Sequence, residues 1–332
     1  MSGESKRGVH LQSRDLAILR GLFESRVMSL NHISLMYFEG RKEAATRRVR
    51  HLKAAGAIAE YPRQRYQPSL LFLSSTGFEL LQTHRVLVDH PALTWNRIRR
   101  RAYVSPQMLR HELAILDVKA ALKVAVANEV GISLLEFLTW QHLFQFKARL
   151  ADGARPSLIQ PDGFIRLRQA TVGANPIDHA FFIEVDRSTE SQDILARRAD
   201  SYVDYYRSGG YAIKQGGACS DFKRYPFRVL FILQNEERRN NLAERLLLNC
   251  PPILTQIWLA TTDEVTKNPL GTIWIQPLDY RKATAGTPFD PRSQTLALRH
   301  RRRSERDKWI QTAISKHPLT ECSPQIIIPS ND

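Results

Sequence analysis

Apolar residues recur at helical spacing three times within the first 55 positions, and two short strand-like runs then follow. This order limits the fold more than any other feature of the sequence, because helices and strands bury their side chains at different periods. The expected elements, in chain order, are helices at 11–24, from Ser29 and at 42–55, strands at 58–61 and 70–73, and a closing helix from Ser75. Three helices, a two-stranded hairpin and a closing helix predict a winged helix-turn-helix over residues 1–90.

The third helix and the loop between the two strands carry much of the positive charge of this region. Ala45, Val49 and Leu52 form the face of the helix that we expect to be buried, and Gly56 ends the helix. In a winged helix the third helix enters the major groove of DNA, and Lys and Arg neutralise phosphates. The candidate DNA-binding residues are therefore Arg47, Arg48, Arg50, His51, Lys53, Arg63 and Arg65. Two alternatives stay open, an ordinary solvated basic face and a protein–protein module built on the same fold.

The net charge of the chain is +15, and the excess lies at its two ends. Residues 1–110 contain 19 basic and 8 acidic side chains, a net charge of +11, and residues 281–332 contain 10 and 5, a net charge of +5. Residues 111–280 are balanced at −1, with 19 and 20. A strongly basic end favours a polyanionic partner, although a basic protein that is merely soluble is the alternative. We expect double-stranded DNA to be bound mainly by the N-terminal module.

Several classes of protein are excluded by what the sequence lacks. No run of 18 or more apolar residues occurs and no apolar stretch opens the chain, so neither a membrane span nor a secretory signal is predicted. Cys219, Cys250 and Cys322 are far apart, which argues against a disulfide framework and against a cysteine-based zinc site. The phosphate-binding motif of P-loop ATPases and the His-x-His pair of histidine-metal relaxases are both absent. We expect a cytoplasmic protein.

Residues 91–104 are predicted to be a basic linker. They include a cluster of arginines from Arg97 to Arg101, interrupted by Ile98. The linker is either a charged, solvated connector or a strap that contacts the DNA backbone.

Residues 105–280 alternate between helical and strand-like patterns, which predicts an α/β domain with a mixed sheet. The expected helices lie at 105–128, 191–207 and 238–248, and the expected strands at 163–168, 180–185, 227–233, 256–260 and 271–276. Residues 281–332 are predicted to form a basic tail that is partly disordered, with a basic helix at about 298–310.

Acidic residues lie at the start of one predicted hairpin strand and at the end of its partner. Asp162 follows Pro161, and Glu184 and Asp186 end the next apolar run. Carboxylates that converge on one point can bind Mg²⁺ through their oxygens, and a metal held there can activate water. Glu112 could add a ligand. The alternative is an ordinary Asp-Gly hairpin turn with solvated acids at the strand end.

These residues belong to stretches that resemble the plasmid replication-relaxation family of mobile-element proteins, over about residues 11–275. The stretches are Arg14-Asp-Leu-Ala-Ile-Leu, Arg48-Val-Arg-His-Leu-Lys-Ala-Ala-Gly, Leu73-Ser-Ser-Thr-Gly-Phe-Glu-Leu-Leu, His111-Glu-Leu-Ala-Ile-Leu-Asp-Val, Gln160-Pro-Asp-Gly, Phe182-Ile-Glu-Val-Asp-Arg-Ser-Thr-Glu and Arg228-Val-Leu-Phe-Ile-Leu. The Glu-x-Asp-Arg-x-Thr run is the most specific of them. The family is similar to one class of plasmid mobilisation relaxases, and the resemblance implies a winged helix joined to a restriction-endonuclease-like domain.

The resemblance also implies a catalytic set made of Asp162, Glu184, Asp186 and Arg198. Asp162 and Glu184 correspond to the acid pair of a Pro-Asp…(Asp/Glu)-x-Lys site, in which Asp186 replaces the lysine. Arg198 stands four residues before Tyr202, where the family resemblance implies a lysine. Arginine keeps the positive charge but cannot act as a base. The site is therefore either active with arginine or a nuclease shape retained for binding DNA.

The sequence as a whole predicts a DNA-binding protein of a plasmid or other mobile element, acting at an origin in replication or mobilisation. A metal-dependent nicking activity at Asp162, Glu184 and Glu112 would need Mg²⁺ or Mn²⁺. The alternatives are a catalytically inactive nuclease-fold protein that binds DNA and a transcriptional regulator. Other replication or mobilisation proteins and a second copy of the chain are further candidate partners.

Overall fold

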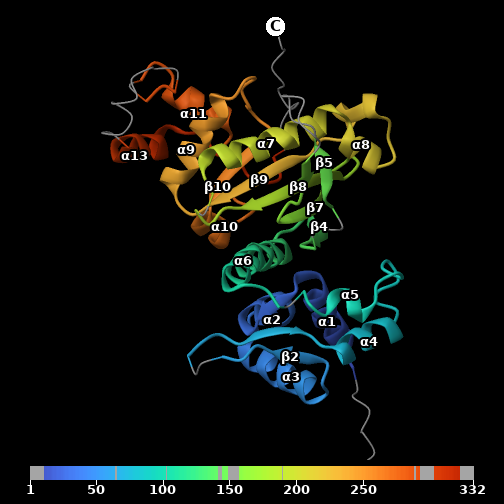
Figure 1. The fold of residues 1–332 in the computed structure, drawn as a ribbon. Helices are drawn as coiled ribbons and strands as arrows, with labels where there is room; N and C mark the ends of the chain where they lie inside the picture. Colours follow the sequence, from blue (N-terminus) through green and yellow to red (C-terminus); the bar gives the residue numbers. More distant parts are fainter. Residues whose placement is uncertain are drawn as a thin grey trace, which may run out of the picture. The chain divides into compact units, whose positions relative to one another are not determined.

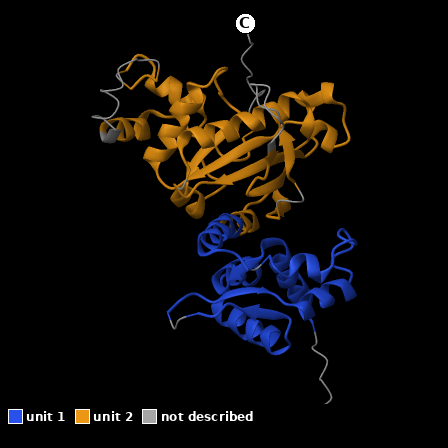
Figure 2. Cartoon of the chain, in the orientation of Figure 1, with its two compact units in different colours: residues 1–120 blue, residues 121–332 orange. Residues whose placement is uncertain are grey.

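The structure is a computed structural model that describes residues 11–63, 66–101, 103–140, 144–148, 157–188, 190–287, 289–291 and 303–321. The chain divides into two compact units, residues 1–120 and residues 121–332 (Figure 2). Helices and strands are mixed, and the larger sheet contains both parallel and antiparallel pairs, which confirms the predicted α/β class.

The first unit combines short helices with a small antiparallel sheet whose strand order is β1-β3-β2 (Figure 1). Its elements are α1 (Ser13–Ser25), β1 (Val27–Ser29), α2 (Leu30–Phe38), α3 (Lys42–Ala54), β2 (Ile58–Glu60), β3 (Leu70–Leu73), α4 (Ser75–Thr83), α5 (Trp95–Ile98) and the first part of α6 (Pro106–Asn128). The three helices, the hairpin and the closing helix that the sequence predicts therefore occur in the expected order. Residues 95–98, expected to be part of a linker, form α5 instead, and Ile98 is buried.

Local chemistry explains where these helices begin and end. The hydroxyl of Ser29 accepts a hydrogen bond from the backbone N–H of His32 at the start of α2, and Ser74 caps α4 in the same way through Gly77. Gly56 follows α3 with a φ of 70°, a left-handed conformation that glycine adopts without strain. The chain can therefore turn sharply from α3 into β2.

Ion pairs join segments of the first unit that are distant in sequence. Arg48 on α3 pairs with Asp15 on α1, whose side chain is fully buried. On α6, Lys119 lies 3.3 Å from Glu24 and Asp117 lies 2.8 Å from His32. These contacts fasten α3 and the first half of α6 to the rest of the unit.

The second unit is built on a five-stranded sheet of order β10-β9-β8-β7-β4 (Figure 1). Strands β8, β9 and β10 are parallel to one another, whereas β7 is antiparallel to both β8 and β4. Its elements are β4 (Ile132–Leu138), β5 (Phe146–Ala148), β6 (Ser157–Ile159), β7 (Gly163–Gln169), β8 (Ile177–Val185), α7 (Gln192–Arg207), α8 (Gly210–Lys214), η2 (Cys219–Arg224), β9 (Arg228–Leu233), α9 (Glu236–Leu247), β10 (Ile257–Thr261), α10 (Thr262–Lys267), α11 (Pro277–Thr284) and α13 (Arg303–Ala313).

Helices α7 and α9 pack on the sheet through a shared hydrophobic core that is rich in aromatic rings. Tyr205 on α7 stacks on Phe146, with ring centroids 3.8 Å apart, and Tyr202 lies 5.4 Å from Phe182 on β8. Both tyrosines and both phenylalanines are buried. This packing fixes the position of α7 over β8, where the acidic residues lie.

The C-terminal part of the second unit differs from the sequence-based expectation in two places. Residues 271–276, expected to form a strand, make only isolated bridges, Leu259 to Ile275 and Trp274 to His317. Helix α13, expected within a basic tail, packs on α9 and places Ile310 fully inside the core. Both segments are buried by contacts with residues that are distant in sequence. The local spacing of apolar residues does not predict such contacts. Residues 292–302 and 322–332 of the predicted tail lie outside the described residues.

Replacement of Gly77 by alanine should destabilise the first unit. A Cβ atom at this position would lie 2.1 Å from the carbonyl oxygen of Ala57 and 2.8 Å from Cδ1 of Leu73, so α4 would have to move away from the sheet. We expect a loss of about 1–3 kcal/mol, as for other overpacked cores, measured by thermal unfolding of the full chain. Ser75→Ala, an exposed change in the same helix, is the control. Wild-type stability of Gly77→Ala would contradict this packing.

Candidate functional site

Two acidic side chains meet where β7 begins and β8 ends. Gly163 pairs with Ile183 in the antiparallel register, so Asp162 lies across from Glu184. The backbone N–H of Asp162 donates to the carbonyl of Ile183 at 3.0 Å, and Oδ2 of Asp162 accepts the N–H of Val185 at 2.8 Å. Asp162 and Glu184 are 5% and 1% exposed. The structure thus brings together the acid pair that the sequence singles out.

Helix α7 supplies the partners of Glu184. Nη1 of Arg198 donates to Oε2 of Glu184 at 2.9 Å, and the hydroxyl of Tyr202 donates to Oε1. Arg198 and Tyr202 are four residues apart, which places them on one face of the helix. Both oxygens of the Glu184 carboxylate are therefore occupied by α7.

The electrostatics of Glu184 follow from this enclosure. Burial raises the pKa of Glu184 to about 8; the positive charge of Arg198 opposes the rise and the nearby charge of Asp162 adds to it. The pKa of Arg198 is raised as well, chiefly by the negative charge of Glu184. Burial also raises the pKa of the Tyr202 hydroxyl, so it remains a proton donor to Glu184.

Asp186 faces a different cation. Both oxygens of its carboxylate are bound by Arg238 on α9, and Nη2 of Arg238 lies 2.9 Å from Oδ1. Arg238 also donates to the backbone carbonyl of Glu190, whose side chain accepts from Nη2 of Arg198 at 3.0 Å. Acids and arginines thus alternate in one network that links β8, α7 and α9. We call Glu184, Asp186, Glu190, Arg198 and Arg238 the acid–arginine network.

The residues present do not fit a magnesium site in this arrangement. Mg²⁺ needs carboxylate oxygens that are free to coordinate it, whereas those of Glu184 and Asp186 accept hydrogen bonds from arginine or tyrosine. Glu112, the third ligand suggested by the sequence, lies in the first unit, where Arg26 approaches it to 3.2 Å. Within the described residues, no group of three or more His, Cys, Asp or Glu side chains is arranged to hold a metal ion.

Most of the predicted DNA-binding residues are exposed, and they differ in whether an acid pairs with them. Arg47, Arg50 and His51 on α3 are exposed and have no ion pair among the described residues. Lys53 and Arg63 are also exposed, but both pair with Glu60, whose pKa falls to about 2, mainly because Lys53 donates to its carboxylate.

Two further residues of the predicted DNA-binding set are placed differently. Arg48 is turned toward Asp15 and binds both oxygens of that carboxylate. Arg65 lies outside the described residues. Of the predicted DNA-binding residues on α3, Arg47, Arg50 and His51 are therefore the ones without an ion pair among the described residues.

Sequence reasoning did not anticipate the roles of Arg238 and Glu190. Arg238 is 52 positions from Asp186, and no local spacing connects the two residues. Glu190 was visible in the run that follows β8, but its contacts with Arg198 and Arg238 depend on where α7 and α9 pack. Only the four-residue spacing of Arg198 and Tyr202 was a usable signal.

A family model described as replication-relaxation matches residues 19–220, so the chain belongs to the replication-relaxation family. The match begins within α1, covers the following helices and the hairpin of the first unit, and in the second unit includes Asp162, Glu184 and Arg198. It connects the chain with the replication or mobilisation of plasmid DNA. Neither the curated proteins nor the solved structures gave a match. In the part of the chain that the structure describes, no helix is long and apolar enough to cross a membrane.

Substitution of Glu184 by glutamine should change how stability depends on pH. Because the pKa of Glu184 is raised in the folded protein, the folded state holds a proton that the unfolded chain releases above its ordinary pKa of 4.5. The free energy of unfolding of the wild type should therefore decrease between about pH 4.5 and 8, by up to a few kcal/mol. Glu184→Gln should remove this slope, as measured by urea unfolding across that range.

Glu190→Gln is the matched control. Glu190 also contacts Arg198, but this variant keeps the Glu184 carboxyl group, so the slope that Glu184 causes should remain. An unchanged slope in Glu184→Gln would mean that Glu184 is ionised throughout this range.

Proposed function

We propose that the protein binds double-stranded DNA at the origin of a plasmid or other mobile element and acts there in replication or mobilisation. The observation that carries this proposal is the outer face of α3, where Arg47, Arg50 and His51 are exposed and unpaired among the described residues. Membership of the replication-relaxation family supports an origin as the place of binding.

The arrangement of the first unit supports a winged-helix mode of binding. Helices α2 and α3 pack against each other, and α3 buries Ala45, Val49 and Leu52 while its opposite face meets solvent. A helix presented in this way fits the major groove, where arginine can bind guanine edges or phosphates. The loop between β2 and β3 corresponds to the wing.

The contribution of each basic residue depends on its partner. The ion pair between Arg48 and the buried Asp15 holds α3 against α1, so we assign Arg48 to positioning the helix. Lys53 and Arg63 are held by Glu60 and must leave it before they can neutralise a phosphate. Arg47 and Arg50 need no such exchange, and we expect them to contribute most.

For the second unit we propose a restriction-endonuclease-like domain in which the acid–arginine network stabilises the fold and no metal is bound. Arg198 and Arg238 donate hydrogen bonds to the buried acids Glu184 and Asp186 and so satisfy their oxygens. A DNA-nicking endonuclease that uses Mg²⁺ or Mn²⁺ is the second candidate, favoured by Asp162 and Glu184 lying side by side.

Removal of the α3 cations should weaken DNA binding and its dependence on salt. If the arginine contacts a base, we expect Arg47→Gln and Arg50→Gln each to weaken the binding free energy by about 1–3 kcal/mol. If it contacts a phosphate, we expect the slope of log affinity against log salt concentration to decrease in magnitude by about 1. Binding of duplex DNA carrying the cognate origin, titrated at several salt concentrations, measures both.

Lys267→Gln is the control for this experiment. Lys267 is an exposed cation of α10 in the second unit, so the change removes the same charge without touching α3. Equal loss of affinity in Lys267→Gln and Arg47→Gln would indicate binding by net charge alone. Wild-type affinity in the double variant Arg47→Gln/Arg50→Gln would contradict the proposed surface.

Supercoiled plasmid carrying the origin separates the two candidates for the second unit. If the acid–arginine network is structural, the wild type should bind this plasmid and leave it supercoiled with either Mg²⁺ or Mn²⁺, as gel electrophoresis would show. Metal-dependent nicking that is lost in both Asp162→Asn and Glu184→Gln would establish the nicking endonuclease instead. Nicking that persists in both variants would indicate a contaminating nuclease.

A further inference from the structure

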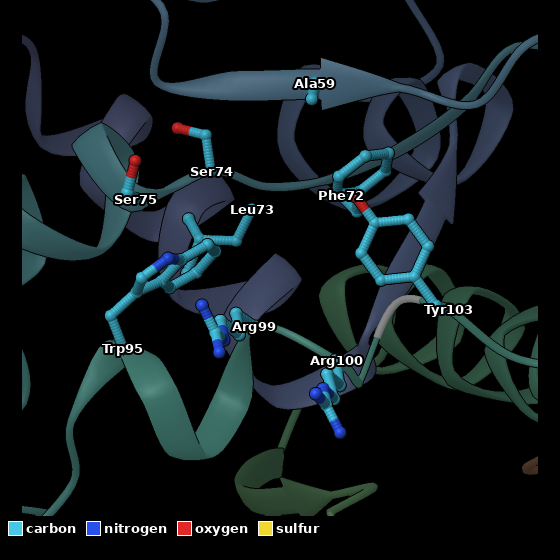
Figure 3. Close-up of a pocket in the computed structure, with 9 residues that line it drawn as sticks. All are labelled: Ala59, Phe72, Leu73, Ser74, Ser75, Trp95, Arg99, Arg100 and Tyr103. Atoms are coloured by element: carbon cyan, nitrogen blue, oxygen red, sulfur yellow. The ribbon is translucent and has the colours of Figure 1, made fainter.

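A pocket of about 790 Å³ opens on the surface of the first unit, between the sheet, the start of α4 and the segment that contains α5. Figure 3 shows Trp95 and Tyr103 at opposite ends of this pocket, with Phe72 and Leu73 of β3 between them. Pockets of this size bind small organic groups. The proposed binding of duplex DNA through α3 makes no use of the residues that line it.

Flat aromatic surfaces are the first property of this pocket. Tyr103 is 71% exposed, and its ring centroid lies 6.1 Å from that of Phe72. Trp95 packs on Phe78 of α4, with ring centroids 6.1 Å apart, and remains partly accessible. Because Tyr103 is mostly exposed, its ring adds little to the hydrophobic core. The ring instead offers a face on which a planar group can stack.

Unpaired positive charge is the second property. Arg99 and Arg100 line the pocket and are exposed, and neither has an ion pair among the described residues. The next residue, Arg101, differs, because its guanidinium donates to the backbone carbonyls of Phe23 and Glu24 at 2.6 and 3.1 Å. Arg101 thus fastens the segment to the end of α1, and it leaves Arg99 and Arg100 in place beside the aromatic rings.

Together these properties specify a ligand that is planar and apolar at one part and anionic at another. A nucleotide has both parts in one unit, a base that can stack and a phosphate that arginine can bind. In duplex DNA the faces of the bases are covered by their neighbours, so only an unpaired nucleotide can use the aromatic rings. An acidic peptide would satisfy the arginines and leave the rings without a stacking partner.

We propose that this pocket binds unpaired nucleotides of single-stranded DNA, with bases stacked on Tyr103 and Trp95 and phosphates at Arg99 and Arg100. The choice of DNA as the ligand rests on the proposed function, since an origin that is opened for replication or mobilisation exposes single strands. The pocket would give the protein a second contact with DNA, chemically separate from that of α3.

Fluorescence anisotropy with a labelled oligothymidylate of twenty nucleotides tests this site on the full chain. Tyr103→Ser should weaken binding about fivefold or more, the loss expected for one stacked base, and Tyr103→Phe should retain wild-type affinity. Arg99→Gln/Arg100→Gln should weaken binding and lower its dependence on salt. In addition, bound oligonucleotide should quench part of the tryptophan fluorescence in the wild type and less of it in Trp95→Phe.

Arg97→Gln is the matched charge control, because Arg97 is exposed on α5 and does not line the pocket. All variants are also titrated with origin duplex. Under the proposal, Tyr103→Ser binds duplex as the wild type does, and Arg47→Gln/Arg50→Gln loses duplex binding while keeping most of its affinity for the oligothymidylate.

Three results would overturn the inference. In the first, both Tyr103→Ser and Arg99→Gln/Arg100→Gln bind the oligothymidylate with wild-type affinity. In the second, the wild type does not bind the oligothymidylate. In the third, the wild type binds free thymidine monophosphate as tightly as the oligothymidylate. A different result would contradict only the proposed function. The wild type would then fail to bind origin duplex, while its binding of the oligothymidylate would still depend on Tyr103, and the pocket would remain a single-strand site.

Discussion

The second unit depends on the polar partners of an acid, Glu184, that its own sheet buries. Glu184 lies at the end of a strand with almost no exposure, where an ionised acid without a partner is strongly unfavourable. Arg198 and Tyr202 supply the partners, and both come from one face of α7. Two sets of contacts, the aromatic packing and these polar contacts, therefore hold α7 in the same orientation. Arg238 extends this arrangement to α9 through Asp186.

In the first unit, too, an ion pair between an arginine and a buried acid holds a helix in place, but here neighbouring arginines of the same helix remain exposed. Arg48 and the buried Asp15 hold α3 from the inside, as Arg198 holds Glu184. Arg47 and Arg50, on either side of Arg48 in sequence, lie on the exposed part of the helix and have no such partner among the described residues. Neighbouring residues of one type thus differ in role according to the face of the helix that they occupy.

Most of the fold could be predicted from the sequence, because the spacing of apolar residues marks most helices of both units and the central strands. The approach of Asp162 to Glu184 was also within reach, since a hairpin register brings strand ends together. The rest depends on distant packing. The partner of Arg48 lies 33 positions away and that of Asp186 lies 52 away, and residues 271–276 take their conformation from single bridges to separate segments.

The attachment of α6 to the first unit has a consequence for how relatives of this protein could exchange parts by recombination. Lys119, which is almost fully buried, contacts Glu24, and Asp117 contacts His32. A crossover within residues 91–104 would separate Lys119 from Glu24 and Asp117 from His32, although Glu24 would keep Arg20 as a partner. Crossovers that fall after Lys119 would keep the pairs intact. The first unit is therefore inherited together with the first half of a helix that the sequence alone assigns to the next domain.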